Sequence, residues 1–380
     1  MRVGKTLTAL RTAKMVGAKN VLFVTKKKAI SSILSDYEMT GYSDMALTVI
    51  NYEKLSKCEK RYDLIIVDEA HSLKKHGKPS LRTKNLKEIV KDNYLILLSG
   101  TPTPESYSDI YHQLWISDNS PFKEWKNFYK WAKEFVNIKQ RYFNGTPHND
   151  YSEAKIEKIM PYIEPLMITY TQKQASFKRT DMAEEVVKVK MVDGIYNLAD
   201  YLRKHKYYKL KDGHEIVCET AVSLQNKLHQ LYSGTIITDN GIAILDESKA
   251  RYIAKHYEPP FAVYYKYKAE ELLLWKHLKN ITTDPEVFNR GEADVFISQV
   301  RSGAMGINLS RANVLIAFNI DFSAELYWQM RARIQAKDKT AQNKIVWLFS
   351  DGGIEEKIYK AVLDKKSYTV KYFKEDYAWN

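Results

Sequence analysis

Two short clusters of polar residues have the composition of a site for a nucleoside triphosphate. Gly4, Lys5 and Thr6 run directly into a stretch of helical character, residues 7–14. Backbone N–H groups at a helix start attract phosphate, so we expect them and the Lys5 ammonium to face phosphate groups. The Thr6 hydroxyl is suited to bind Mg²⁺ beside those phosphates. A Gly-Lys-Thr triplet also arises by chance, so this cluster needs the support of the second.

The second cluster is acidic. Asp68, Glu69, Ala70 and His71 follow the apolar run 64–67, a pattern that indicates a buried strand with carboxylates at its carboxyl end. Asp68 is suited to bind Mg²⁺ directly or through water, and Glu69 to polarise an attacking water molecule. A solvated acidic cluster is the alternative interpretation. Together the two clusters predict that the protein binds ATP with Mg²⁺ and hydrolyses it.

The composition favours two domains and a polyanionic partner. The chain has 380 residues, 44% of them hydrophobic, which is enough for two cores. Lys and Arg number 59 against 46 acidic residues, a formal charge of +13, which favours nucleic acid, with an ordinary basic surface as the alternative. Cys58 and Cys218 match no zinc-site spacing and favour a reducing compartment. Without a membrane-length apolar run or secretory signal, we expect a cytoplasmic protein that binds no membrane.

Regular elements must position these clusters, and short β-rich runs alternate with helical stretches through the first hundred residues. The runs cover residues 21–25, 47–50, 64–68 and 94–99. This alternation predicts a parallel sheet with helices on both faces and ligands beyond the carboxyl ends of the strands. From about residue 106 to 165 the pattern is helical and aromatic without a clear strand. We therefore expect a helical insertion whose aromatic residues pack together.

The second half repeats the alternation. We expect a strand at 186–192, helices at 197–210 and 220–232, a hairpin at 235–245 closed by Asn240-Gly241, and strands at 261–265, 295–298, 314–318 and 345–349. The sequence therefore predicts an α/β fold with two doubly wound parallel-sheet domains, joined near residues 166–183.

A second group of candidate site residues lies in this half. Residues 302–309 form a glycine-punctuated turn after a strand, and Gln329, Arg331 and Arg333 follow on a helix. Such a turn lets backbone approach a phosphate, and Gln and Arg side chains can reach a nucleotide held by the opposite domain. A tight turn beside a charged helix face is the alternative interpretation.

In their order along the chain, these segments resemble the motifs of superfamily 2 nucleic-acid-dependent ATPases, and among them the Snf2-like translocases. Segments similar to motifs I, Ia, Ib, II, III, IV, V and VI lie at residues 1–6, 21–30, 50–53, 68–71, 98–102, 261–267, 302–309 and 329–333. Residues 228–231 and 352–358 resemble a helix-borne family signature and the segment that closes the second domain. The resemblance thus covers nearly the whole chain.

The resemblance implies two RecA-like domains in tandem. Residues 1–170 would form an ATP-binding domain that lacks its first strand and carries the insertion at about 105–165. Residues 171–380 would form a helicase C-terminal domain, with a hinge near 167–178. It also implies that Gly4, Lys5 and Thr6 bind the phosphates of ATP, that Thr6 and Asp68 hold Mg²⁺, and that Glu69 is the general base.

Further roles are implied by the same resemblance. The residues expected to couple nucleotide state to the second domain are His71, Ser99 and Thr101. Those expected to complete the nucleotide site are Gly306, Gln329 and either Arg333 or Arg331 as the arginine that stabilises transition-state charge. Those expected to contact the nucleic-acid backbone are Lys26, Lys27, Lys28, Asn51, Lys266 and Ser302, with a plain solvated surface as the alternative for the lysines.

The sequence departs from the family pattern in two places. Ala336 stands where motif VI usually carries a second arginine. The chain also begins inside motif I, so the strand before the phosphate loop and the adenine-contacting segment are absent from it. We therefore expect unpaired backbone groups in the first sheet, and a parent reading frame that extends upstream.

The function that this resemblance implies is an ATP-driven motor that translocates on nucleic acid. Double-stranded DNA is the favoured track, with RNA as a second possibility. A helicase that unwinds duplex DNA or RNA is one alternative. A non-catalytic nucleic-acid-binding module with a degenerate motor is another, motivated by the shortened loop and Ala336.

Overall fold

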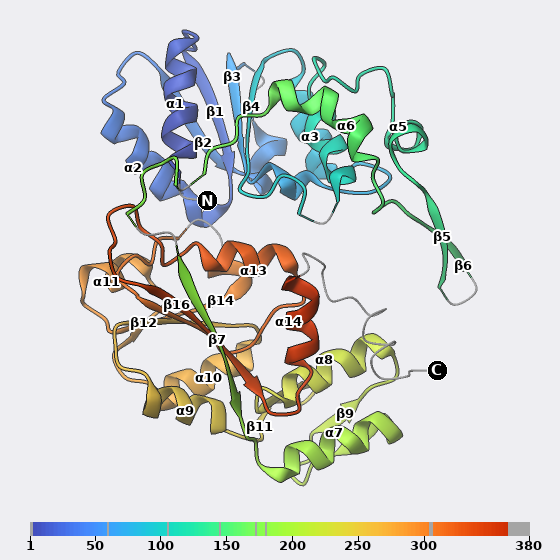
Figure 1. Ribbon diagram of the computed structural model, residues 1–380, viewed down its shortest axis with the longest axis vertical. Helices are drawn as coiled ribbons and strands as arrows, with labels where there is room; N and C mark the ends of the chain where they lie inside the picture. Colours follow the sequence, from blue (N-terminus) through green and yellow to red (C-terminus); the bar gives the residue numbers. More distant parts are fainter. Residues whose placement is uncertain are drawn as a thin grey trace. The chain divides into compact units, whose positions relative to one another are not determined.

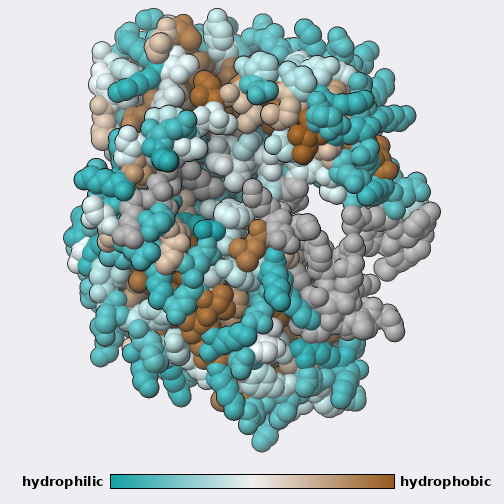
Figure 2. Space-filling view, viewed as in Figure 1, coloured by the Kyte–Doolittle hydropathy of each residue, from teal (hydrophilic) through white to brown (hydrophobic). Residues whose placement is uncertain are grey.

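The computed structural model describes residues 3–58, 61–104, 106–143, 146–171, 173–178, 181–303 and 307–363. The chain divides into two compact units, Met1–Gln174 and Ala175–Asn380, called unit 1 and unit 2 below (Figure 1). The visible face in Figure 2 is mostly hydrophilic, in line with a chain of which 28% is charged. The assignment of residues 1–170 and 171–380 to an ATP-binding and a helicase C-terminal domain stays a proposal.

Unit 1 contains a four-stranded parallel sheet in the order β2-β1-β3-β4. Its strands are β1 (Asn20–Thr25), β2 (Ala46–Asn51), β3 (Leu64–Asp68) and β4 (Tyr94–Leu98). The central strands β1 and β3 are buried on both faces, which is why they occur in the sequence as continuous apolar runs. Helices α1 (Lys5–Met15) and α2 (Ile30–Thr40) pack on one face and α3 (Leu81–Val90) on the other.

Backbone pairing is continuous from β2 to β4, and among the described residues the outer side of β4 has no strand beside it, so the expected unpaired backbone groups can lie only at the edges of this sheet. β3 and β4 pair directly, in a parallel register that runs from Leu64↔Tyr94 to Asp68↔Leu98. Because each strand supplies the other's ladder partners, this part of the sheet is satisfied without an intervening strand.

The predicted insertion contains α4 (Ile110–Trp115), α5 (Phe128–Phe135) and α6 (Ile156–Ile163). Its aromatic side chains form one buried cluster, in which Tyr111, Phe122, Phe128, Trp131 and Phe135 are at most 1% exposed. The prediction that these aromatic residues pack among helices is confirmed.

The insertion is not purely helical, which corrects the sequence-based expectation. Strands β5 (Lys139–Phe143) and β6 (Thr146–Asp150) pair as an antiparallel hairpin that extends beyond α5 and α6 (Figure 1). Residues 139–150 contain few apolar residues, so no alternation of apolar and polar residues marks the strands in the sequence. The Asn144-Gly145 pair was the available signal, because this dipeptide favours two-residue hairpin turns.

Unit 2 contains a six-stranded parallel sheet in the order β13-β14-β12-β15-β16-β7. Its strands are β7 (Met182–Val189), β12 (Phe261–Tyr265), β13 (Ile281–Thr282), β14 (Val295–Gln299), β15 (Val314–Ala317) and β16 (Asn343–Ser350). Helices α9 (Ser248–His256) and α10 (Lys268–His277) pack on one face. The other face is covered by α7 (Asp193–His205), α8 (Ala221–Leu231), α11 (Pro285–Arg290), α13 (Ala324–Arg331) and α14 (Glu355–Leu363). The predicted doubly wound α/β fold is confirmed for both units.

Three predicted elements in unit 2 differ in their bounds from the structure. β7 begins before residue 186 because it pairs with β16 along its whole length. α7 ends at His205, since Lys206 adopts a left-handed φ of 63°, and Tyr207–Lys209 then forms β8, which pairs with β9 (Glu215–Val217). The hairpin of β10 (Thr235–Thr238) and β11 (Gly241–Ile244) is confirmed, but its last pair is Thr238↔Gly241, so the turn lies one residue earlier than predicted.

Within the described ranges, no helix combines the length and the apolar character needed to span a bilayer.

Candidate functional site

The parallel sheet of unit 1 brings the predicted site residues to one edge. Thr25 at the end of β1 is in register with Asn51 at the end of β2. β3 ends beside β1 at Asp68, and β4 ends beside β3 at Leu98, one residue before Ser99. All four strands therefore direct their following residues to the same side of the sheet, the usual ligand side of such folds.

Helix α1 begins at this site with Gly4, Lys5 and Thr6. Gly4 caps the helix with a left-handed φ of 81°, a conformation that glycine adopts without the strain of a side chain. The positive end of the helix dipole and the N–H groups of its first turn favour a negatively charged ligand there. Thr6 lies in that first turn. The Lys5 charge lowers the pKa of Asp68, so the phosphate loop and the acidic motif share one electrostatic environment.

Asp68 is held by one residue of the neighbouring strand β1 and by one residue of the 3₁₀ helix that follows β2. The Thr25 hydroxyl donates to Asp68 Oδ2 at 2.9 Å, and the Tyr52 hydroxyl donates to the Asp68 carbonyl at 2.6 Å. Burial raises the pKa of Asp68, with the Glu69 charge acting in the same direction and Lys5 and Thr25 in the opposite one. A buried carboxylate of this kind is stabilised by a nearby cation.

The donors at this edge fit Mg²⁺ bound together with nucleotide phosphates. Among the described residues, no cluster of three His, Cys, Asp or Glu side chains could hold a metal ion by itself. Mg²⁺ is commonly bound by one or two protein oxygens, substrate phosphates and water. Thr6 and Asp68 supply that number of protein ligands.

Glu69, His71, Ser99 and Thr101 form a chain of contacts between the ends of β3 and β4. The His71 side chain is fully buried, and its Nδ1 lies 3.3 Å from Glu69 Oε2 and 2.7 Å from Ser99 Oγ. Ser99 Oγ accepts a hydrogen bond from the Thr101 backbone N–H at 3.1 Å. Within the described part of the chain, Glu69 Oε2 and Thr101 Oγ1 are buried without a hydrogen-bond partner. Buried oxygens of this kind are normally satisfied by water or a ligand.

The basic residues of this edge lie next to Asn51. Lys26 precedes the short 3₁₀ helix Lys27–Ala29 directly after β1, and Lys27 and Lys28 are exposed. The Asn51 side chain accepts a hydrogen bond from the Lys54 backbone N–H at 3.2 Å and so caps the next 3₁₀ helix. Asn51 thus has a local structural role in addition to the predicted one.

In unit 2, Lys266 differs from the exposed cation that we expected. It follows β12, is 8% exposed, and places Nζ 3.7 Å from Asp321 Oδ2 and 3.2 Å from the centre of the Phe322 ring. Burial lowers the pKa of Lys266 to about 8. The exposed cation at this place is Arg301, whose Nε lies 3.4 Å from the same Asp321 oxygen while 69% of its side chain is exposed. Sequence reasoning missed Arg301 because we began the motif at Ser302.

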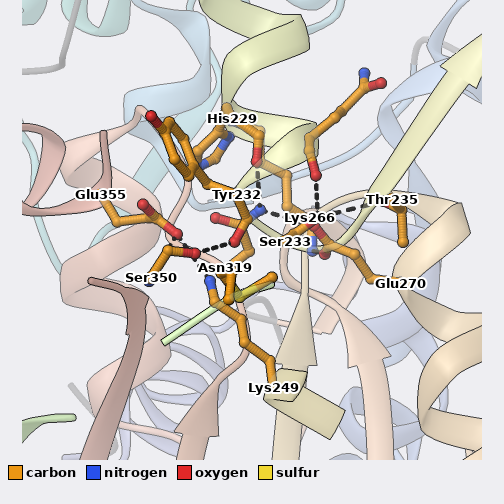
Figure 3. A network of polar contacts seen from close by, with 12 residues as sticks. His229, Tyr232, Ser233, Thr235, Lys249, Lys266, Glu270, Asn319, Ser350 and Glu355 are labelled. Carbon is orange, nitrogen blue, oxygen red and sulfur yellow. Dashed lines mark hydrogen bonds and ion pairs between the residues drawn. The ribbon is translucent and has the colours of Figure 1, made fainter. Parts of the chain in front are cut away.

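A buried polar network fixes the carboxyl edge of this second sheet (Figure 3). Glu270 accepts hydrogen bonds from the Lys266 backbone N–H at 2.8 Å and from Asn319 Nδ2 at 2.7 Å. In the same network, Lys249 on α9 and Glu355 on α14 form an ion pair of 2.7 Å, with at most 1% of either side chain exposed. Removing one partner of a buried ion pair typically lowers the free energy of unfolding by about 3–5 kcal/mol. Glu355 Oε1 also accepts a hydrogen bond from the Ser350 N–H at 3.2 Å, so the buried contacts reach the ends of β12, β15 and β16.

The glycine-punctuated segment is partly described. Ser302 Oγ donates to the Gln299 carbonyl at 3.1 Å, which caps the end of β14. Gly303 accepts a hydrogen bond from the Tyr264 hydroxyl at 2.7 Å, and a Cβ atom there would lie 2.6 Å from the Tyr264 ring, so only glycine fits. Gly306 lies outside the described residues.

The residues of the last motif lie on and just after α13. Gln329 is fully buried, and its Nε2 donates to Glu325 Oε1 at 3.2 Å. Arg331 forms an ion pair with Glu184, with Nη2 2.5 Å from Oε1. Arg333 is 8% exposed, and its carbonyl accepts a hydrogen bond from the Leu309 N–H at 3.0 Å. The motifs at 302–309 and 329–333 are thus joined within unit 2.

Comparison with known proteins identifies the family. The SNF2-related domain matches residues 3–234, and the helicase conserved C-terminal domain matches residues 279–336. An uncharacterized ATP-dependent helicase of Mycoplasma genitalium, MG018, is 22% identical over 348 residues, which cover 84% of this chain and 31% of that protein. The nuclear protein STH1/NPS1 of Saccharomyces cerevisiae is 21% identical over 379 residues, covering 86% and 27%.

Two further similarities complete the comparison. The ISWI chromatin-remodeling complex ATPase CHR11 of Arabidopsis thaliana is 22% identical over 388 residues, covering 91% of this chain and 35% of that protein. The SWI2/SNF2 ATPase core domain of Sulfolobus solfataricus is 15% identical over 95% of this chain and 82% of that one, with a TM-score of 0.38, too low to support a conclusion. The chain spans about a third of the length of these relatives. Because the first domain matches more than half of it, the chain belongs to the SNF2-related family, and the predicted tandem of RecA-like α/β domains is confirmed.

Proposed function

We propose that this member of the SNF2-related family is a nucleic-acid-dependent ATPase that works as a motor on DNA. One observation carries the proposal: Lys5, Asp68 and Glu69 meet at the carboxyl edge of one parallel sheet, beside the start of a helix. Helix start, ammonium and paired carboxylates are the parts that phosphoryl transfer needs, because catalysis of this reaction is mostly positioning and charge stabilisation.

Each residue of this edge has a separate task. Backbone N–H groups of the first turn of α1 and the Lys5 ammonium bind the phosphates. Thr6 and Asp68 hold Mg²⁺, which supplies positive charge to the phosphate oxygens when it is bound. Glu69 accepts a proton at Oε2 from the water that attacks the γ-phosphorus, and its contact with His71 orients the carboxylate.

The contacts of His71 suggest how the reaction is coupled to the rest of the protein. His71 contacts both the proposed base Glu69 and Ser99. A movement of Ser99 at the end of β4 would therefore change the position of the Glu69 carboxylate through His71. Arg333 is proposed to stabilise the charge that develops on the γ-phosphate.

Exposed cations are proposed to bind the nucleic-acid backbone. Lys27 and Lys28 in unit 1 and Arg301 in unit 2 are suited to phosphate contacts, which are independent of sequence and weaken with salt. Double-stranded DNA is the favoured track because one relative is named as the ATPase of a chromatin-remodeling complex. A helicase that separates strands is the second candidate, favoured by the name of the Mycoplasma relative.

The test measures ATP turnover with duplex DNA, single-stranded DNA, RNA or no nucleic acid. Duplex DNA should stimulate turnover most, and Glu69→Gln should lower the stimulated kcat by about 10²-fold or more, because a general base contributes that much. Glu157→Gln, which removes an exposed carboxylate on α6, is the matched control and should act as wild type. Equal turnover with and without nucleic acid would refute the proposal. Strand displacement on a forked duplex would favour the helicase. DNA binding without ATP turnover would favour a non-catalytic nucleic-acid-binding module.

A further inference from the structure

One carboxylate in unit 2 receives donors from four side chains. Glu184 on β7 pairs with Arg331 Nη2 at 2.5 Å. Its Oε2 also accepts hydrogen bonds from the Tyr327 hydroxyl at 2.9 Å, from Trp347 Nε1 at 3.0 Å and from the Tyr359 hydroxyl at 3.2 Å. These five residues are called the Glu184 clasp below. The clasp joins β7, β16, α13 and α14.

Ring stacking makes the Glu184 clasp rigid. The Tyr327 and Trp347 rings stack with centroids 4.9 Å apart and an interplanar angle of 16°, and the Tyr359 ring lies 5.4 Å from that of Trp347. The Arg331 guanidinium lies 4.7 Å from the centre of the Trp328 ring, and its Nη1 also donates to the Tyr327 hydroxyl at 3.2 Å. Burial, followed by the Glu184 charge, raises the pKa of Tyr327. Arg331 therefore contacts Glu184, Tyr327 and Trp328, all within unit 2.

Arg333 lies two residues after Arg331, the last residue of α13 and a member of the Glu184 clasp. α13 stops at Arg331, and the Arg333 N–H then donates to the Met330 carbonyl at 3.0 Å in a tighter turn. The Arg333 carbonyl is held in turn by the Leu309 N–H. The position of Arg333 thus depends on the two anchors around it: the clasp through α13, and the segment that follows residue 306.

We propose that Glu184 and Arg331 are positioning residues that fix the end of α13, from which Arg333 alone acts on the nucleotide. This inference rests on the proposed function and assigns the transition-state arginine that the sequence left open between two positions. Arg331 does not contact the nucleotide. Glu184 contributes to turnover through the helix that it anchors.

A double-mutant cycle tests this assignment. Glu184→Gln and Arg331→Met should each lower kcat per folded molecule by about tenfold with the KM for ATP within about twofold, because displaced catalytic groups lose rate steeply. The double variant should be no slower than the slower single variant, since both changes break the same anchor. Arg333→Met should lower kcat by about 10³-fold. Folded fractions are taken from thermal melts followed by circular dichroism.

Glu185→Gln is the matched control. Glu185 is the next residue of β7 and pairs with Lys344 on the same neighbouring strand β16, but both side chains are at least 40% exposed. Its loss should leave kcat within about twofold of wild type, as expected for an exposed pair.

Three outcomes would overturn the inference. If the two losses multiply to about 100-fold and Arg331→Met raises the KM, Arg331 contacts the nucleotide directly. If the variants melt earlier but keep the wild-type kcat per folded molecule, the clasp serves stability only. If Arg331→Met costs more than Arg333→Met, the assignment of the two arginines is reversed. An inactive wild type would instead defeat the proposed function itself, so the two failures are distinguishable.

Discussion

At the scale of single residues, burial decides which charged groups are free to act. Asp68 is half-buried, and burial raises its pKa, so its charged form favours a nearby cation. Arg301 keeps most of its side chain exposed to solvent, although its Nε lies beside Asp321. Lys266, which has the same sequence-based expectation as the lysines after β1, is buried against an aromatic ring instead. The sequence shows which residues are charged, but only the tertiary structure separates these environments.

Lys266 makes the stability of the protein depend on pH. Burial lowers its pKa to about 8 from an ordinary value of 10.5, so between these values the unfolded chain binds more protons than the folded one. The stability contributed by this site therefore rises with pH across that window, by at most about 1.4 kcal/mol per pH unit.

The measurement is the difference in melting temperature between wild type and Lys266→Met at pH 7.5 and 9.5. The melting temperature of the wild type, relative to that of the variant, should increase as the pH rises. Lys268→Met, which removes an exposed lysine at the start of α10, should show no such trend. A difference that is constant or moves the other way would contradict the burial of a charged Lys266.

At the scale of elements, the insertion depends on its aromatic cluster. Phe135 on α5 is 1% exposed and contacts Trp131, Trp125 and Phe122 with ring centroids 5.2, 4.9 and 5.6 Å away. Phe135→Ala should destabilise unit 1 by about 3–5 kcal/mol, because it removes buried area and leaves a cavity. Tyr129→Ala on the same helix, where 46% of the side chain is exposed, should cost much less. Denaturant unfolding followed by tryptophan fluorescence measures both, and equal losses would argue against a packed insertion.

Prediction of strands from the sequence succeeded for continuous apolar runs and failed for polar segments. β1, β3, β12 and β14 are buried along their length and were predicted within about one residue. The sequence of β5 and β6 does not alternate apolar and polar residues, so it gave no signal for strands. β8 was predicted as the end of a helix, because the left-handed residue that stops α7 is Lys206 rather than a glycine.

The same limit applies to the candidate site. The residues after β1, β3 and β4 could be predicted to meet, because parallel strands carry their carboxyl ends to one edge. The Glu184 clasp could not, because Glu184 and Tyr327 lie 143 residues apart and no local spacing links them. Contacts of that kind depend on the packing of β7 beside β16, which only the three-dimensional structure reveals.

At the scale of the whole molecule, the residues proposed to bind the nucleotide phosphates belong to unit 1, and the proposed transition-state arginine Arg333 and the exposed Arg301 belong to unit 2. The formal charge of +13 favours association with a polyanion at long range. The first matched domain covers unit 1 and continues to residue 234 of unit 2, and the second lies within unit 2, so substitutions in either unit should affect turnover. A motor that steps along its track also leaves it at the ends, so its turnover depends on how long the track is.

The most direct test of the central claim is therefore steady-state ATP turnover on duplexes of increasing length, at a constant total concentration of base pairs. Turnover should rise with duplex length and then level off, and Glu69→Gln should remain slower than wild type by about 10²-fold or more at every length. Turnover that is the same on every duplex as in the absence of DNA would contradict the central claim.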